Sequence, residues 1–535
     1  MSSTFKASPI SMILRDDIAA RASLLAGRLE KKEYRPETIS AMDVWDWPGD
    51  WEGRTILGLT RLAVATKKEP AYLHDIVKAT LNNCNERGYM GMMLPAGEAH
   101  EQQLSGNGWL LRGLIAYYQY TGKKEIYDAA VRLGQNLYLP LIELYKNYPG
   151  KPEERVYAGG ESGNVAGVVR GWRISTDTGC AFIAMDGVSA LYELTGDKAL
   201  GELLSVMVSQ FIKLDYESIG AQTHATLTST RAILRMYRIT GEKWYLDEAI
   251  RIYDLYTTCG MTASYENYNW FGRRAWTEPC TVIDSFLCAM QLYTATRERK
   301  YVTLAQRIYF NGMGFGQREN GGFGCDSGLG ATGVANNHII EKHCEEAYWC
   351  CTMRGGEGLA SVGEYAYLTD DGARTVTVPY FISNDVTLDI AGEKITLSAR
   401  TRYPYKSSAN YEILENGLIS PITMQIYLPD TAENVKIDGA AYKLEGGFAY
   451  ITVDASTKNI SIAFDLPLTL EIPHGKYNDK DRVAIFYGNA IMSMDAKEEV
   501  AALGGTVSDA LKEKLHLLFD AYEQGHAPRR ALFEN

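Results

Sequence analysis

The sequence predicts an α+β multidomain protein, with an (α/α)6 toroid of helical hairpins over residues 1–368, a β-sandwich over 369–495 and a C-terminal helical tail over 496–535. Three observations predict it. Apolar residues recur at intervals of three and four from about residue 15 to 367, several helices end at similar breaks, and the apolar period changes to two near residue 370. The 535 residues suffice for more than one domain.

The helical region is repetitive. Each predicted helix ends at a break and a second amphipathic helix follows it, as in "YTGKKEIYDAAVRLGQNL" and "ITGEKWYLDEAIRIYDLY". Glycine just past a helix end is a common stop signal. Five or six such hairpins favour a closed toroid or an open solenoid, and the long inserted loops favour the toroid, because they can build a cleft at one of its ends. The breaks lie at Thr66, Thr121, Thr195, Thr240 and Thr296.

Short alternating segments follow the helical region. "RTVTVPYFI", "KITLSART", "ITMQIYL" and "NISIAFDL" are separated by turn residues, which is typical of a β-sandwich. The segment "VSDALKEKLHLLFDAYEQ" returns to a helical period and predicts the helical tail.

Composition excludes several kinds of partner. The chain is 46% hydrophobic and 22% charged, as in globular proteins, and its net charge of -12 argues against nucleic acid or an anionic membrane as the main partner. No apolar run is long enough to span a membrane. The N-terminal stretch "MSSTFKASPISMILRDDIAARA" lacks the pattern of a secretory signal, so we expect a cytoplasmic protein. Its nine cysteines should then bind metal, react or pack in the core rather than form disulfides.

Two cysteine motifs point to a metal site. "CEEAYWCCTMRGGEGLA" places Cys350 beside Cys351, and "AWTEPCTVIDSFLCAMQLY" places Glu278 two residues before Cys280. In the second motif Glu278 fits a helix cap and Pro279 the first helical position, so Cys280 lies where the helix dipole stabilises a thiolate. Together the pairs can supply four tetrahedral ligands, a mixture of thiolate and carboxylate that zinc accepts.

Other interpretations of these cysteines remain open. An isolated Cys-Cys pair is about as often buried packing as a functional site. A second ligand set would combine His343 and Cys344 with the Cys350–Cys351 pair, and Cys325 is a further candidate on the same loop. Core packing is the expectation for the cysteines within or beside helical patterns, which are Cys84, Cys180, Cys259 and Cys288.

Glu-x-Cys before a helix, followed about seventy residues later by "YWCCTMRGGEGLASVGEYAYL", resembles the β-L-arabinofuranosidase group of glycoside hydrolases, related to families 127 and 146. The stretch "SPITMQIYLPDTAENVKIDGAAY" is similar to the strand-rich part of that group. The resemblance implies an (α/α)6 toroid with β-sandwich domains. It also implies a retaining, zinc-dependent glycosidase whose nucleophile is a cysteine.

Carried over to this sequence, the resemblance implies a role for individual residues. Zn²⁺ would be bound by Glu278, Cys280, Cys350 and Cys351, with Cys350 also the nucleophile. Glu266 would be the acid/base, and His224 and Trp349 would contact the sugar. Glu345 and Glu346 are the next acid/base candidates, although a solvated acidic turn is the plainer interpretation of both.

The leading hypothesis is therefore a glycosidase that acts on a small carbohydrate carrying a β-L-arabinofuranosyl or related group. One alternative is a carbohydrate-binding or scaffold protein with structural zinc, since four protein ligands usually close a structural site. Another is a different (α/α)6 sugar enzyme, such as an epimerase or an unsaturated uronyl hydrolase. The sequence leaves a homo-oligomer open.

Overall fold

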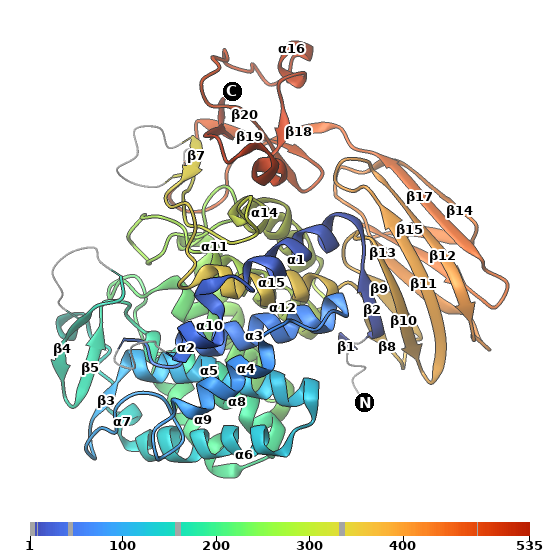
Figure 1. Ribbon diagram of the computed structural model, residues 1–535. Coiled ribbons are helices and arrows are strands. Elements are labelled where there is room, and N and C mark those ends of the chain that lie inside the picture. Colours follow the sequence, from blue (N-terminus) through green and yellow to red (C-terminus); the bar gives the residue numbers. More distant parts are fainter. Residues whose placement is uncertain (1–5, 8, 41–45, 156–161, 331–337, 479) are drawn as a thin grey trace.

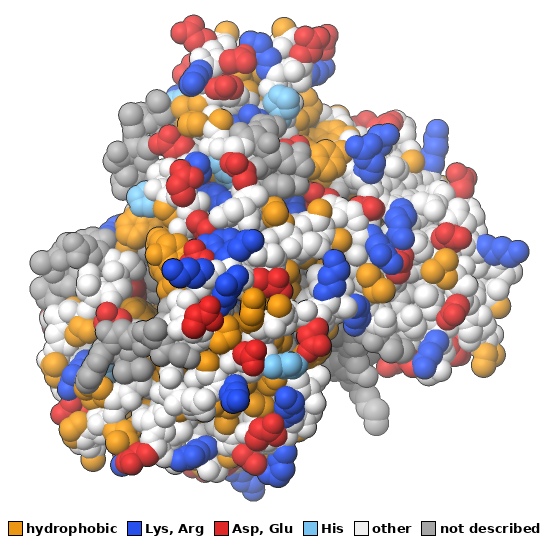
Figure 2. All heavy atoms as spheres, viewed as in Figure 1, with side chains coloured by type: hydrophobic (Ala, Val, Ile, Leu, Met, Phe, Trp, Pro, Cys, Tyr) orange, Lys and Arg blue, Asp and Glu red, His pale blue; other side chains and the backbone are white. Residues whose placement is uncertain are grey.

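The computed structural model describes residues 6–7, 9–40, 46–155, 162–330, 338–478 and 480–535. Figure 1 shows a body of helices, with a pair of sheets beside it and a further sheet of short strands above it. The described part of the chain contains no helix long and apolar enough to cross a bilayer. On the face seen in Figure 2, acidic and basic side chains are interspersed.

A closed ring of helices forms the centre of the body. Within the described ranges the ring has six inner helices, each packed against the next, and the last returns to the first. These are α3 (Asp50–Thr66), α5 (Glu101–Thr121), α8 (Ala184–Thr195), α10 (Thr223–Thr240), α12 (Pro279–Thr296) and α15 (Cys351–Glu364). Each inner helix has an outer partner, in the same order α4 (Leu73–Asn82), α6 (Lys124–Leu133), α9 (Lys198–Phe211), α11 (Lys243–Cys259), α13 (Arg299–Arg307) and α1 (Asp16–Arg28). The predicted toroid is confirmed.

The five predicted breaks are the C-terminal residues of α3, α5, α8, α10 and α12. In each, the threonine hydroxyl donates to the carbonyl four residues back and accepts from the backbone N–H two residues ahead. The residue after the threonine is left-handed, which a glycine such as Gly122 or Gly241 adopts without strain. A threonine thus ends five of the six inner helices, and the left-handed residue after it, a glycine in three of the five, turns the chain toward the outer helix.

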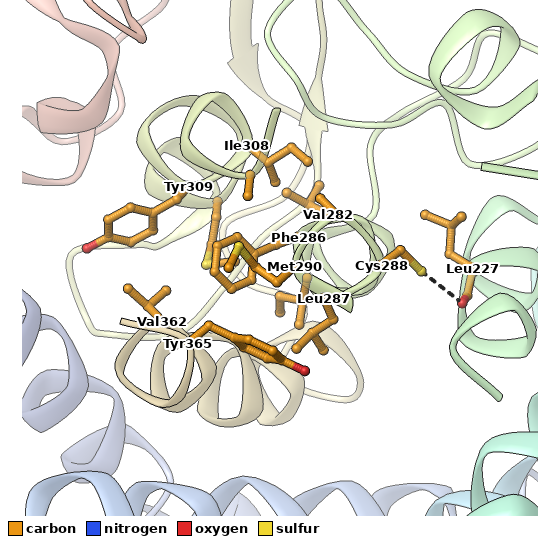
Figure 3. Packing of buried hydrophobic residues seen from close by; sticks show 14 of the residues in the cluster. Leu227, Val282, Phe286, Leu287, Cys288, Met290, Ile308, Tyr309, Val362 and Tyr365 are labelled. Carbon is orange, nitrogen blue, oxygen red and sulfur yellow. Dashed lines mark hydrogen bonds between the residues drawn. The ribbon is translucent and has the colours of Figure 1, made fainter. Parts of the chain in front are cut away.

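The inner helices are buried on almost all sides. Figure 3 shows α12 with Phe286 and Met290 directed into a cluster that also holds Tyr309 and Val362. On another side of α12 the Cys288 thiol donates to the Leu227 carbonyl, at 3.6 Å. Cys288 is therefore a core residue, as predicted, and Cys180 and Cys259 are buried too.

Two six-stranded sheets make up the sandwich seen at the side of the body in Figure 1. The first has the order β1 (Lys6–Ala7), β8 (Leu368–Asp370), β9 (Thr375–Val378), β13 (Ile422–Tyr427), β16 (Phe448–Val453), β15 (Tyr442–Glu445). The second has the order β14 (Glu433–Asp438), β17 (Asn459–Asp465), β12 (Ser408–Asn416), β11 (Glu393–Thr401), β10 (Asn384–Ile390), β2 (Pro9–Leu14). Alternate residues of β10 are buried, as the period of two predicts. The N-terminal strands β1 and β2 also belong to this sandwich, beyond its predicted range of 369–495. The last three strands inside that range, over 468–495, belong instead to a different sheet.

The predicted helical tail over 496–535 is wrong. Its helical content is a short α16 (Asp509–Lys512) and a 3₁₀ segment at Leu518–Gln524. The rest includes strands β21 (His516–Leu517), β22 (Arg529–Arg530) and β23 (Phe533–Glu534), which join an eight-stranded sheet with β6 (Asp326–Ser327), β7 (Ile339–Lys342), β18 (Leu468–Glu471), β19 (Arg482–Tyr487) and β20 (Ala490–Asp495). Leu511, Leu515 and Phe533 pack on Val483 and Ile485, so tertiary pairing overrides the helical period of the tail.

The remaining elements are short. A three-stranded sheet has the order β3 (Ala99–His100), β5 (Trp172–Ser175), β4 (Val165–Val169). The short helices are α2 (Pro36–Ser40), α7 (Ile142–Lys146) and α14 (Gly314–Gly316). The loops before α3, α8, α10, α12 and α15 all contribute to one cavity, described next.

Candidate active site and metal centre

A cavity of about 820 Å³ lies at the end of the toroid where inner helices begin. Its lining comes from the starts of α3, α10, α12 and α15 and from loops that precede them. Among the lining residues are Trp47, Asp50, Trp51, Arg54, Asp177, His224, Trp276, Glu278, Trp349, Cys350 and Cys351. The cavity therefore combines aromatic faces, carboxyl groups and sulfurs, which is a composition suited to a small polar ligand.

The two predicted motifs come together at the floor of this cavity. Glu278 is the N-cap of α12, with Pro279 in the first turn, and Cys350 is the N-cap of α15. The Cys280 Sγ lies 3.4 Å from the Cys350 Sγ and 3.7 Å from the Cys351 Sγ. The Cys350 Sγ is 3.9 Å from Glu278 Oε1. All four ligand atoms lie within 4.8 Å of one another.

This spacing fits one tetrahedral ion. With metal–sulfur bonds of about 2.3 Å, neighbouring sulfurs of a tetrahedral site lie about 3.8 Å apart. The positive ends of two helix dipoles, those of α12 and α15, face the anionic ligands. The Gln222 amide donates to Glu278 Oε2 at 3.3 Å, which orients the carboxylate. The four residues can therefore hold a metal ion.

Burial shapes the protonation of the four ligands. It raises the pKa of Glu278 well above its usual range, and the nearby Cys350 thiolate raises it further. Hydrogen bonds from the Cys280 and Cys351 thiols lower the pKa of Cys350 well below that of a free thiol, with a further contribution from Arg54. Burial raises the pKa of Cys280 instead. Cys350 is thus the sulfur that carries negative charge most readily.

The rival ligand set is not assembled. Within the described residues, the His, Cys, Asp and Glu ligand atoms that gather closely enough for one ion come from Glu278, Cys280, Cys350 and Cys351. The His343 ring stacks on Trp276, with centroids 5.2 Å apart, and the Cys344 Sγ accepts from the Cys325 backbone N–H at 3.3 Å. Cys325 and Cys344 therefore form a pair on the cavity wall, and the Cys325 thiol also contacts Cys351.

Arg54 is a site residue that the sequence patterns did not identify. It lies one helical turn after Asp50 on α3, and its Nε is 2.8 Å from Asp50 Oδ2. Its Nη1 donates to the Cys280 Sγ at 3.1 Å and to the Cys350 Sγ at 3.4 Å. The only sequence signal was the Asp-x-x-x-Arg spacing at the start of a helix, which ordinarily indicates a surface ion pair.

His224 lies in the first turn of α10 and lines the cavity. Its Nδ1 is 3.0 Å from Asp284 Oδ2, and its Nε2 is 3.4 Å from Arg54 Nη2. A ring that donates from Nδ1 to the carboxylate presents the Nε2 lone pair to Arg54. Trp109 stacks on the ring with centroids 5.8 Å apart. His224 is therefore held in one orientation, with both nitrogens engaged by the protein.

Glu266 is buried and does not occur among the described residues that line the cavity. Its Oε2 accepts from the Ser264 hydroxyl at 2.7 Å. Burial raises the pKa of Glu266 well above its usual range, and the neighbouring Asp326 raises it further. Arg318 binds Asp326 at 2.8 Å and keeps that partner charged, so Glu266 holds the proton.

Asp177 is a carboxyl that does line the cavity. It accepts from the Ser162 hydroxyl at 2.9 Å and from the Gly163 backbone N–H at 2.9 Å. Burial raises the pKa of Asp177 to about 6, and the Cys350 thiolate contributes to the rise. Sequence reasoning missed it, because an aspartate in a loop carries no spacing signal.

The other predicted residues divide between cavity and surface. The Trp349 side chain is 49% exposed and lines the cavity next to Cys350. Glu345 is exposed and paired with Lys342, as expected of a solvated turn. Glu346 is not solvated: it binds Arg28 at 2.9 Å with only 10% of its side chain exposed, because that ion pair and Thr352 hold it against the protein.

No protein-family model matches the chain. A GH127 β-arabinofuranosidase aligns in structure with a TM-score of 0.70 and 16% identity, covering 99% of this chain and 98% of that one. A GH127 β-L-arabinofuranosidase from Geobacillus stearothermophilus T6 aligns with a TM-score of 0.70 and 13% identity, covering 98% of this chain and 100% of that one. This chain has the GH127 fold. The fold that the family resemblance implied is thus confirmed over nearly the whole chain.

In sequence, a non-reducing end β-L-arabinofuranosidase of Bifidobacterium longum subsp. longum is 24% identical over 228 residues, 39% of this chain. The match covers 34% of that protein, about a third of its length. In the GH127 fold of this chain, the two cysteine motifs lie at the cavity end of the toroid.

Proposed function

We propose that this chain is a retaining glycoside hydrolase that releases β-L-arabinofuranose or a closely related sugar from small glycosides. The observation that carries the proposal is the meeting of Glu278 and three cysteine sulfurs within 4.8 Å, on the floor of a cavity in the GH127 fold. The names of the structural and sequence relatives supply the sugar class. A cavity of about 820 Å³ has room for a monosaccharide and part of its leaving group.

The donor set favours Zn²⁺ as the metal, because zinc accepts tetrahedral sites of thiolates with one carboxylate. When bound, zinc keeps its thiolate ligands deprotonated at neutral pH and acts as a Lewis acid. Glu278, Cys280, Cys350 and Cys351 would hold it.

The Cys350 thiolate is the nucleophile in this proposal. In the first step Cys350 Sγ bonds to the anomeric carbon, and the carbon–oxygen bond to the leaving group breaks. The leaving oxygen keeps the electron pair and takes a proton from an acid. In the second step a water oxygen bonds to the anomeric carbon, the carbon–sulfur bond breaks, its electron pair returns to Cys350, and the water proton passes to the same residue acting as base. Two displacements at one carbon retain its configuration.

The acid/base role of Glu266 stays a prediction. Its proton suits an acid, whereas its place outside the cavity lining favours Asp177 for the same role. Trp349 offers an exposed aromatic face to the substrate, and His224 supports the floor of the site. A cytoplasmic location and small imported substrates also stay predictions.

The deciding experiment combines aryl β-L-arabinofuranosides with proton NMR of the first product formed. We expect release of L-arabinose in the β configuration, and about one zinc per chain by elemental analysis. Epimerised sugar with no hydrolysis would instead identify a different (α/α)6 enzyme. Sugar binding without turnover, with zinc present, would identify a carbohydrate-binding protein with a structural zinc site.

A further inference from the structure

Arg54 is a buried cation in contact with the reacting sulfur. Its guanidinium donates from one nitrogen, Nη1, to both Cys280 and Cys350, at 3.1 and 3.4 Å. That nitrogen carries two hydrogens and can serve both sulfurs together. The opposite edge is fixed by Asp50 at 2.8 Å, and the guanidinium lies over Trp109, 4.6 Å from the ring centre.

The negative charge of the four ligands favours a cation beside the sulfurs. Three thiolates and one carboxylate carry four negative charges, so a divalent ion leaves a net charge of about -2 in the site. Uncompensated buried charge is strongly unfavourable, and hydrogen bonds from a fixed guanidinium offset it. Arg54 is itself buried, so water does not screen its interaction with the sulfurs.

We propose that Arg54 is a catalytic residue that makes Cys350 a good leaving group in the second step. The inference rests on the proposed function. While Cys350 is a thiolate, at the start and end of the cycle, it accepts the hydrogen bond from Arg54. In the covalent intermediate the sulfur is a neutral thioether and a poor acceptor, and Nη1 keeps only its bond to Cys280.

Arg54 therefore stabilises both thiolate states relative to the intermediate between them. Hydrogen bonding makes the thiolate less basic, so the carbon–sulfur bond breaks more readily, while attack by the sulfur gains nothing. Loss of Arg54 should then slow the second step and leave the first step unimpaired. A merely structural role for Arg54 would lower both steps together.

Arg54→Gln tests this, because the shorter neutral amide can still serve Asp50 but does not reach the sulfurs. With an aryl β-L-arabinofuranoside we expect a burst of about one aryl group per chain, followed by turnover 10- to 100-fold slower than in the wild type, on the order of one lost charged hydrogen bond. Intact-mass analysis should show one sugar adduct, on Cys350. The steady-state turnover of Arg54→Lys should fall between those of the wild type and Arg54→Gln.

The matched control is Arg61→Gln, two turns further along α3, where the side chain binds Glu364 near the surface instead of the sulfurs. It should behave as the wild type. Equal losses in burst rate and steady-state rate in Arg54→Gln, or no accumulated adduct, would overturn the inference. If Arg54→Gln does not fold, Arg54→Lys decides by the same measurements, since its single ammonium cannot serve both sulfurs and Asp50.

A second readout needs no turnover. In protein loaded with Co²⁺, the sulfur-to-cobalt absorption band should move to longer wavelength in Arg54→Gln, because removing a donor raises the energy of the sulfur lone pairs. A band at the wild-type wavelength would mean that Arg54 does not bind the thiolates, and it would contradict the proposed role of Arg54. If the wild type forms no adduct and hydrolyses no arabinofuranoside, the proposed function fails, and the cobalt band alone then decides whether Arg54 binds the thiolates.

Discussion

Two groups of cysteines share one cavity and differ in how the chain supplies them. Cys280, Cys350 and Cys351 come from the starts of α12 and α15, where the helix dipoles favour anions. Cys325 and Cys344 lie just beyond the short β6–β7 ladder, in which Asp326 pairs with Lys342. The first group has Glu278 beside it, whereas in the second group the Cys344 sulfur accepts from the Cys325 backbone N–H and the Cys325 thiol contacts Cys351.

The two groups differ in whether their side chains are arranged to hold a metal ion. At the ladder, the Cys325 N–H satisfies the Cys344 sulfur, and Arg318 binds the carbonyls of both residues at 2.9 and 3.0 Å. At the helix starts, three sulfurs and a carboxylate face one point with the spacing of a tetrahedron. The two groups therefore differ in where their sulfurs point and in the negative charge gathered around that point, and not merely in how many sulfurs they contain.

The largest expected effect is that of Cys350→Ser. A serine hydroxyl is scarcely ionised at neutral pH, so turnover should fall by about 10⁴-fold or more. Zinc measured by elemental analysis should be reduced but present, since three ligands remain. Near-normal turnover in this variant would contradict the proposed difference between the two groups, because Cys350 would then have no role in the chemistry.

The proton donor gives the next largest effect. One of Glu266 and Asp177 should be the acid. Replacing that residue, as Glu266→Gln or Asp177→Asn, should lower kcat/KM by about 10²- to 10⁴-fold for substrates with poor leaving groups and much less for activated aryl glycosides. Comparing kcat/KM for alkyl and nitrophenyl glycosides in both variants assigns the role. Equal losses with both substrate classes in a variant would exclude that residue as the acid.

Metal removal should separate the two cysteine groups. Cys280→Ser, like Cys350→Ser, should reduce the bound zinc, and it should lower the apparent unfolding temperature on the order of 5 °C, because metal binding contributes folding free energy. Cys344→Ser is the matched control, and it should keep about one zinc per chain and the unfolding temperature within a few degrees. Zinc loss in both variants would show that the groups form one site.

The smallest effect concerns reactivity at the ladder. A hydrogen bond from Cys325 lowers the pKa of Cys344 to about 7. Because only the thiolate reacts, its rate of alkylation by iodoacetamide should rise with pH and level off above that value. Peptide mapping should find the label on Cys344, and Cys344→Ser should remove it without changing the zinc content. A rate still rising steeply above pH 9 would contradict the lowered pKa.

Local sequence patterns specify the helical repeat and the start of the helix that carries Glu278 and Cys280. The helix-ending threonines, such as Thr121 and Thr240, follow from local hydrogen bonds that need no distant partner. The Glu-Pro-Cys motif likewise specifies a helix start, and this placed Glu278 and Cys280 correctly. Such features are readable because their physical cause lies within a few residues of chain.

The fold of the tail, the position of Arg54 beside the sulfurs and the choice between ligand sets depend on tertiary contacts. The apolar residues around Leu515 have a helical period, yet strands β19 and β20 supply both backbone partners and an apolar surface for the tail. Arg54 reaches Cys350 across 296 positions of sequence. Cys344 is nearer to Cys350 in sequence than Cys280 is, yet it turns to Cys325. Contacts between distant segments depend on how the inner helices close into a ring, and no local pattern encodes that closure.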